Sequence, residues 1–367
     1  MNPDDIEVME SVSEAPTSKK KPEKPEGVLY VGIDLGTSRT AVAASNGERE
    51  SVASYVGYPK DIISRKALQT EALYGVEALD KRLMLDLYRP LEHGVIKFSE
   101  DQDNPEYGAN ARAAADLVRH AVSLAKPRPD DLVYAVIGCP AEGSVKNKKA
   151  ILDAARTVVD SAMICSEPFA VAYGLDLFMD TLVVDIGAGT TDLCRMRGTM
   201  PAPEDQITLT YAGDHIDREL TKLLEKHCAG AQFTVHKVQE IKERASFVGD
   251  SMDEVLVELP VDGKPTQFEV SEPLRQACRS IVDPIVEALG KLIGSFDPDF
   301  QSRLKNNVLL GGGGSQIGGL GRVIEARMQD LLGEGRVTTV AEPVYAGANG
   351  ALKTAHDMPA EYWEQLR

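Results

Sequence analysis

Long apolar runs, closely spaced cysteines and an excess of positive charge are all missing from this sequence of 367 residues. No stretch reaches the roughly 20 uninterrupted apolar residues that are needed to cross a bilayer. The amino terminus, MNPDDIEVME, has neither the basic nor the apolar region of a secretory signal. We therefore expect a protein that stays in the cytoplasm and has no transmembrane segment.

Metal-binding and disulfide patterns are also missing. The cysteines are odd in number, far apart and never spaced as C-x-x-C, which argues against a disulfide framework or a zinc site and favours buried free thiols. They are Cys139, Cys165, Cys194, Cys228 and Cys278. The six histidines show no H-x-x-x-H or H-E-x-x-H spacing, so we assign no catalytic role to any of them.

The net charge of the chain is strongly negative, at −17 at pH 7. Nucleic acids and anionic lipids are polyanions that attract basic surfaces, so we expect no nucleic-acid partner. A cation such as Mg²⁺ and basic partners fit better. With 43% hydrophobic residues, the chain can bury a sizeable core, and its length indicates two domains or one bilobal unit.

Residues 1–26 are predicted to be a disordered tail, because they are rich in Pro, Ser, Glu and Lys and poor in apolar side chains. The lysines at 19–21 stand among glutamates, which is typical of a solvated tether. A contact of these lysines with a membrane or a partner is the alternative.

An internal duplication follows the tail. The segment VLYVGIDLGTSRTAVAAS is a β-rich run, a Gly-Thr-Ser turn and a second β-compatible run, which predicts a hairpin. The segment TLVVDIGAGTTDLCRM repeats this pattern. When Asp34 is aligned with Asp185, glycine and threonine recur at the same offsets.

Strand and helix patterns alternate after each hairpin, which predicts a parallel or mixed sheet covered by helices on both faces, once in each half. In the second half we expect a single long helix from Glu272 to about Ile293 and then the strand NVLLG.

Three glycine-rich segments carry the candidate chemistry. A hairpin tip of Gly, Thr and Ser exposes backbone N–H groups and hydroxyls to a phosphate, and the two aspartates could face Mg²⁺ through its waters. The third segment, LLGGGGSQIGGL, ends a strand and begins a helix, so a base and ribose could pack on its backbone. An ordinary turn or a flexible loop is the simpler interpretation of each segment alone, and a Rossmann motif competes for the third.

Together these segments resemble the ATPase superfamily of actins, heat-shock chaperones and sugar kinases. Two connecting motifs, IGCPAEGSVKNKKAILDAA and AEPVYAGANGALKTA, complete its five motifs in order across residues 32–355. A closer resemblance to the magnetosome-associated bacterial actins lies in SYVGYPKDII, SEPFAVAYGLD, MPAPEDQITLTYAGDHID, ASFVG and PAEYW.

The resemblance implies an α/β actin-like ATPase fold, with two RNase H-like lobes around a nucleotide cleft and a smaller subdomain inserted in each. The first lobe is expected over 27–170, with an insert at about 58–97, and is completed by about 345–367. The second lobe is expected over 171–344, with an insert at about 217–272.

The resemblance also assigns roles to residues. It implies that Glu167 orients the attacking water, that Asp185 acts beside it, and that Asp34 and Asp185 hold Mg²⁺ through water. It implies nucleotide or phosphate contacts from Asp34, Gly36, Thr37, Ser38, Gly187, Ala188, Gly189, Thr190, Thr191, Gly213, Asp214, Lys242, Glu243, Gly312, Gly313, Gly314 and Ser315.

Three positions depart from the family pattern. Ala188 replaces a common glycine in the second hairpin tip, and Gln239 replaces an acidic ribose contact of some relatives. Arg39 stands where smaller or different residues often occur, and strand alternation predicts that it points away from the nucleotide.

The resemblance implies an ATP-hydrolysing bacterial actin that binds ATP or ADP and Mg²⁺, polymerises with itself, and aligns magnetosomes together with adaptor proteins. A nucleotide-binding scaffold with little turnover and a small-molecule kinase remain alternatives. A chaperone would need a peptide-binding domain after the ATPase, and this chain ends shortly after the last family motif.

Overall fold

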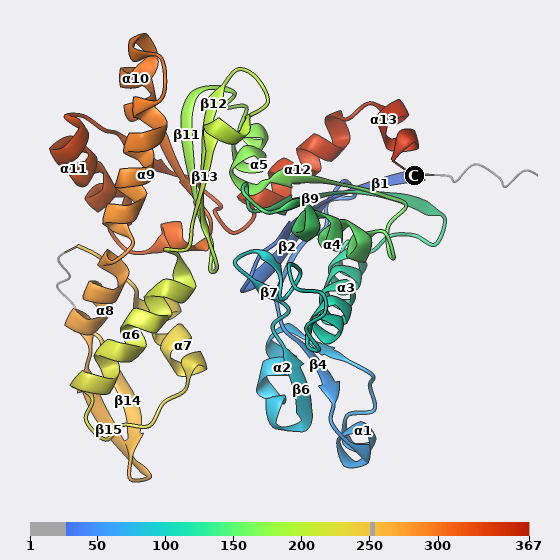
Figure 1. The fold of residues 1–367 in the computed structure, drawn as a ribbon. Helices are drawn as coiled ribbons and strands as arrows, with labels where there is room; N and C mark the ends of the chain where they lie inside the picture. Colours follow the sequence, from blue (N-terminus) through green and yellow to red (C-terminus); the bar gives the residue numbers. More distant parts are fainter. Residues whose placement is uncertain (1–26, 250–253, 367) are drawn as a thin grey trace, which may run out of the picture.

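The computed structural model describes residues 27–249 and 254–366, so the predicted tail over residues 1–26 lies outside the described part. Two five-stranded sheets form the frame of the molecule, and we name the two halves after them. The first lobe is built on the sheet with the order β10-β9-β1-β2-β3, and the second lobe on the sheet with the order β13-β12-β11-β16-β17. The two lobes lie side by side with helices between them (Figure 1).

The sheets repeat one arrangement. In the first lobe the strands are β1 (Gly27–Leu35), β2 (Arg39–Ala44), β3 (Arg49–Ala53), β9 (Asp131–Cys139) and β10 (Ser161–Ser166). In the second lobe they are β11 (Met179–Ile186), β12 (Thr191–Arg197), β13 (Gln206–Leu209), β16 (Val308–Gly311) and β17 (Val337–Thr339). β1 pairs antiparallel with β2 and parallel with β9, and β11 pairs in the same way with β12 and β16. Both predicted hairpins and the duplication are confirmed.

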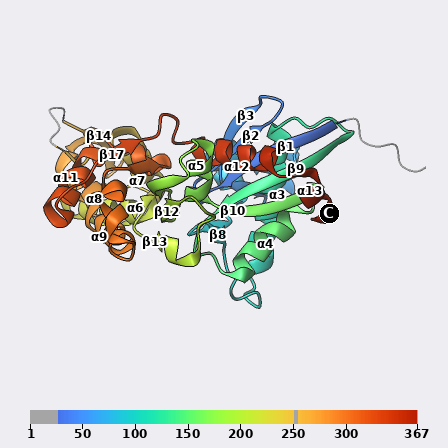
Figure 2. The same cartoon turned by 90° about the horizontal axis from the view of Figure 1, so that it is seen from above.

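Helices cover both faces of the first sheet. α3 (Tyr107–Leu124) and α4 (Val145–Ala155) bury their apolar side chains against one face, where Leu117 and Ile151 are almost completely buried. On the opposite face, α12 (Ala346–Asp357) packs against β1, β2 and β9. α12 therefore returns the end of the chain to the first sheet, as Figure 2 shows from above.

The two lobes are connected by α5 (Glu167–Gly174) and α12, which pack closely against each other. A Cβ atom on Gly350 would overlap the carbonyl group of Ala170, so the two backbones touch there without a side chain between them. This close approach requires glycine, because any larger residue would push the helices apart. The short α13 (Ala360–Gln365) follows and buries Trp363.

The second lobe has a larger apolar core. Its helices are α6 (Gly213–His227), α7 (Val235–Ala245), α8 (Ser271–Arg279), α9 (Val282–Gly294), α10 (Pro298–Lys305) and α11 (Leu320–Leu332). Side chains of α6, α8, α9 and α11 pack with those of β11, β12 and β16 in one cluster of buried residues. The predicted helix from Glu272 to Ile293 is two helices, α8 and α9. Pro284 lacks an N–H donor, so it lies in the first turn of a new helix, where no donor is needed.

Smaller elements project from each lobe. In the first lobe, β4 (Val56–Pro59), β5 (Leu73–Tyr74) and β6 (Leu85–Tyr88) form a small sheet with α1 (Ile62–Leu68), α2 (Gly75–Asp80) and η1 (Arg82–Met84). In the second lobe, β14 (Leu256–Val261) pairs with β15 (Lys264–Glu269). The remaining short elements are β7 (Leu91–Glu92), β8 (Val95–Ile96), η2 (Pro203–Asp205) and η3 (Gly313–Gln316). The expected lobe boundaries and insert limits stay predictions.

None of the described helices combines the length and the apolar character that a membrane span requires.

Candidate nucleotide site

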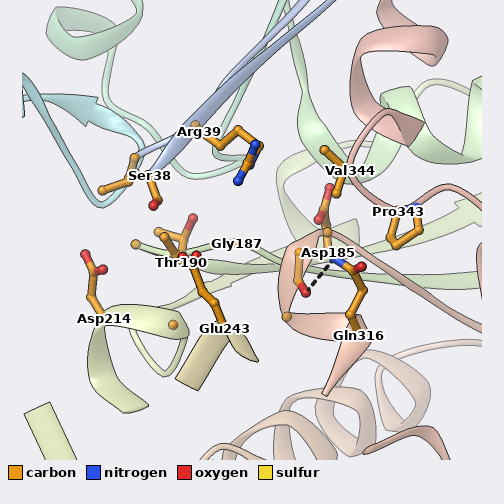
Figure 3. Close-up of a pocket in the computed structure, with 18 of the residues that line it drawn as sticks. Ser38, Arg39, Asp185, Gly187, Thr190, Asp214, Glu243, Gln316, Pro343 and Val344 are labelled. Carbon is orange, nitrogen blue, oxygen red and sulfur yellow. Dashed lines mark hydrogen bonds between the residues drawn. The ribbon is translucent and has the colours of Figure 1, made fainter. Parts of the chain in front are cut away.

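A cavity of about 490 Å³ opens where the two hairpin tips face each other. Its lining comes from both lobes, including β1 and the β1–β2 tip on one side and the β11–β12 tip, α6, α7 and η3 on the other (Figure 3). A concave site of this size between two lobes can take a ligand as large as a nucleotide. Most of the residues predicted from the sequence line this cavity: Asp34, Gly36, Thr37, Ser38, Glu167, Asp185, Gly187, Ala188, Gly189, Thr190, Gly213, Asp214, Lys242, Glu243, Gly312, Gly313 and Gly314.

The first tip, residues 36–38, is held from behind by other parts of the first lobe. The hydroxyl group of Ser54 donates a hydrogen bond to the Gly36 carbonyl over 2.7 Å. The Arg89 guanidinium donates to the Thr37 carbonyl over 3.0 Å, and the Gly94 N–H donates to the Thr37 hydroxyl over 2.8 Å. These bonds fix the shape of the tip before any ligand arrives.

The second tip, residues 187–190, is tied to the start of α6. The Gly213 and Asp214 N–H groups donate to the carbonyls of Gly187 and Ala188 over 3.1 and 2.7 Å. At the far end of the tip, His93 Nδ1 of the first lobe lies 2.9 Å from the carbonyl oxygen of Gly189. A Cβ atom on Gly189 would lie 2.8 Å from the His93 backbone, so glycine allows the two lobes to meet here.

Three carboxyl groups gather at the base of the cavity, from Asp34, Glu167 and Asp185, and the carboxylate of Asp192 is buried close to them. Burial raises the pKa of Asp34 to about 6. Burial, and then the charges of neighbouring carboxylates, raise the pKa values of Glu167 and Asp185 well above their ordinary values. No described cationic side chain pairs with Asp34, Glu167 or Asp185. Like charges that are brought together in this way favour a bound cation.

This donor set fits Mg²⁺ held largely by water and phosphate. Carboxylate oxygen is the ligand that Mg²⁺ prefers, and the ion usually keeps several of its waters. Within 27–249 and 254–366, no three His, Cys, Asp or Glu side chains are close enough together to hold a metal directly. Asp34 and Asp185 are thus suited to contact the water shell of the ion rather than to enclose it.

Gly312 and Gly314, which follow β16, pack closely against Asp185 and Ile186 at the end of β11. Gly312 has φ +72°, and a Cβ atom there would overlap the Asp185 carboxylate and lie 2.5 Å from the carbonyl oxygen of Ile186. A Cβ atom on Gly314 would overlap the Ile186 side chain. Glycine is therefore required at Gly312 by both conformation and space. This backbone faces the part of the cavity that is lined by Glu243, Ser246, Gln316, Ile317, Pro343 and Val344.

Lys242 of α7 also belongs to the site. Its ammonium group donates to the Gly213 carbonyl over 2.9 Å and lies 2.8 Å from the Asp217 carboxylate. Burial raises the pKa of Asp217, and the Lys242 charge opposes this rise. Lys242 is not a solvated surface lysine, because it holds the start of α6 beside the second tip. Gln239 lines the same wall.

Three sequence predictions need correction. Thr191 does not line the cavity, because its hydroxyl group donates to the Tyr211 carbonyl inside the lobe over 2.8 Å. Ser315 also turns away and donates to the Gly312 carbonyl over 2.7 Å. Arg39 lines the cavity instead of pointing away from it. Arg39 and Ala41 of β2 both line the cavity, so the alternation of the strand places Arg39 on the cavity side and Thr40 on the other.

Sequence reasoning missed the contribution of the segment between β6 and β8. Arg89 lines no part of the cavity, but its guanidinium donates to the Asp214 carboxylate over 2.8 Å and so joins the two lobes. Gly94 lines the cavity itself. No local pattern marked these residues, since their role depends on the distant parts of the chain that they meet.

Comparisons with known proteins show what the whole chain is similar to. The family model described as MreB/Mbl protein matches residues 29–361. Actin-like protein MamK of Paramagnetospirillum magneticum is 42% identical over 339 residues, which cover 92% of this chain and 95% of that protein. The solved MamK double helical filament has a TM-score of 0.86 and 40% identity, and the match covers 91% of this chain and 100% of that one.

A second solved structure is a non-polymerising MamK mutant bound to AMPPNP. It has a TM-score of 0.68 and 40% identity, and the match covers 90% of this chain and 99% of that chain. Both structures share the actin-like fold found here. The chain belongs to the MreB/Mbl family of actin-like proteins.

Proposed function

We propose that this chain binds Mg²⁺-ATP between its lobes, hydrolyses it to ADP and phosphate, and polymerises into cytoplasmic filaments. The observation that carries the proposal is the group of carboxylates of Asp34, Glu167 and Asp185 at the base of the cavity. Two glycine-rich hairpin tips, with N–H groups and hydroxyls that suit phosphate, meet at the same cavity. The AMPPNP-bound MamK mutant supports nucleotide binding, because its structure is closely similar.

Each part of the site has a proposed task. The backbone N–H groups of the two tips, residues 36–38 and 187–190, bind the phosphates, and Asp34 and Asp185 hold the water shell of Mg²⁺. When bound, Mg²⁺ neutralises negative charge on the phosphates. Glu167, at the start of α5, accepts a hydrogen bond from the attacking water and orients it. The Arg89–Asp214 pair keeps the lobes together around the nucleotide.

Polymerisation is proposed from the similarity to the MamK double helical filament. A head-to-tail contact between identical subunits does not close on itself and therefore propagates. Nucleotide bound between the lobes sets their relative angle, so it can tune how well successive subunits fit. By the same resemblance we propose that the filament aligns magnetosomes and binds magnetosome-associated adaptor proteins.

Phosphate release by purified wild-type protein and by Glu167→Gln tests the catalytic part. We expect wild type to release phosphate from ATP with Mg²⁺ present, and Glu167→Gln to release it about 100-fold more slowly while still binding ATP. Glu258→Gln, at an exposed position on β14, is the matched control and should behave as wild type. ATP binding without release in the wild type would indicate a scaffold with little turnover. Release that requires a hydroxylated acceptor would indicate a kinase.

A further inference from the structure

We infer that Arg39 is a direct contact to the phosphate chain of the nucleotide, in addition to the backbone of the two tips. The inference rests on the proposed nucleotide site and names a residue that carries part of its affinity. Arg39 directly follows Ser38 of the first tip and lines the cavity. Figure 3 shows its side chain projecting into the space between Ser38 and Val344.

The charge of the cavity explains why a cation is needed there. Six carboxylates line it against two cationic side chains, Arg39 and Lys242; the carboxylates are Asp34, Glu167, Asp185, Asp214, Asp217 and Glu243. A polyphosphate adds further negative charge, and Mg²⁺ neutralises only part of it. An arginine beside a phosphate tip supplies both a positive charge and several N–H donors in a planar group.

Arg39 is the cation at the cavity that remains available for a ligand. Lys242 is committed to the Asp217 carboxylate and the Gly213 carbonyl. Arg89, behind the first tip, is committed to the Asp214 carboxylate and the Thr37 carbonyl. Arg39 forms no ion pair with any carboxylate in the described part of the chain.

The hydrogen bond that Arg39 does form is weak and easily exchanged. The exposed Arg39 donates from its guanidinium to the neutral hydroxyl of Ser51, on the neighbouring strand β3, over 3.3 Å. A phosphate oxygen is a stronger acceptor than a hydroxyl group, because it is charged. The side chain can therefore leave Ser51 for the nucleotide, while the backbone of β2 stays paired with β3.

Binding of ATP, ADP and adenosine to variants of the full chain, measured by calorimetry with Mg²⁺, tests the inference. We expect Arg39→Gln to weaken ATP and ADP binding by about 10-fold or more and to leave adenosine binding unchanged, because adenosine has no phosphate. Arg39→Lys should recover part of the loss, since it keeps the charge but not the planar group. Arg128→Ala, which removes an exposed arginine far from the cavity, should match wild type.

The outcomes separate this inference from the proposed function. If wild type binds ATP and Arg39→Gln binds it equally well, the inference is wrong and the nucleotide site stands. If Arg39→Gln weakens adenosine as much as ATP, Arg39 has only a structural role and the inference is again wrong. If wild type binds no adenine nucleotide, the proposed function itself fails.

Discussion

The guanidinium of Arg89 in the first lobe and the carboxylate of Asp214 in the second lie 2.8 Å apart, and the pair joins the two lobes. The side chains are only 21% and 18% exposed, so solvent screens their attraction less than at the surface. Arg89 also donates to the Thr37 carbonyl of the first tip. The contact between the lobes is thus linked to the shape of the first tip, for which we propose phosphate binding.

We predict that Arg89→Ala accelerates nucleotide release. A hydrogen bond to a charged group contributes about 1.5–3 kcal/mol, so its loss should raise the dissociation rate at least about 10-fold. Stopped-flow displacement of a fluorescent ATP analogue measures this rate. Arg327→Ala, which breaks the exposed pair with Asp283, is the control and should leave the rate unchanged. An unchanged rate in Arg89→Ala would show that the pair does not hold the lobes.

Gly312→Ala should abolish tight nucleotide binding, because the new methyl group would collide with the Asp185 carboxylate. Gly333→Ala is a matched control: Gly333 also has positive φ, at +80°, but a Cβ atom there would meet nothing within 4 Å. The control should lose roughly 1–2 kcal/mol of stability from backbone strain and keep its nucleotide affinity. Thermal unfolding and nucleotide titration separate the two effects. Equal affinity in both variants would contradict the proposed role of Gly312.

The stability of the nucleotide-free protein should depend on the ionisation of Asp34. Burial raises its pKa from 3.8 to about 6, so the folded chain holds this proton more firmly than the unfolded chain. The stability that the protonated group contributes is present below pH 4 and is lost as the pH rises through 6. Between pH 5 and 7, the melting temperature of wild type should therefore fall relative to that of Asp34→Asn. Parallel pH curves for the two proteins would argue against a buried, uncompensated carboxylate.

The cysteines should be almost inert in the folded protein. All five are free and buried, and burial raises the pKa values of Cys165, Cys194 and Cys278 to about 12. The thiolate is the reactive form, so labelling at pH 8 should be at least about 100-fold slower than in guanidinium chloride. A colorimetric thiol reagent measures both rates. Rapid labelling of the folded chain would mean that a buried thiol becomes exposed.

Much of the site could be predicted from local sequence. The tips at Asp34 and Asp185 and the glycines before Ser315 were recognisable, because special backbone conformations need glycine at fixed offsets. The fold followed from the repeated hairpins and the alternation of strands and helices. These features depend on neighbours in the chain, which the sequence displays directly.

The sequence predictions fail where contacts between distant residues, or a proline within a helical pattern, decide the structure. The hydrogen bond from Arg89 to Asp214 joins residues 125 positions apart, and no sequence pattern near either residue predicts it. Thr191 occupies a motif position, but the Tyr211 carbonyl draws its hydroxyl group inward. The break between α8 and α9 follows from Pro284, which fits the first turn of a helix but not the middle of a long one.

Sedimentation of the purified wild-type chain with Mg²⁺-ATP, with Mg²⁺-ADP and without nucleotide tests the central claim most directly, with negative-stain microscopy of each pellet. The account predicts that filaments pellet with Mg²⁺-ATP, and that far less protein pellets with Mg²⁺-ADP or without nucleotide. Protein that stays in the supernatant under all three conditions would contradict the account.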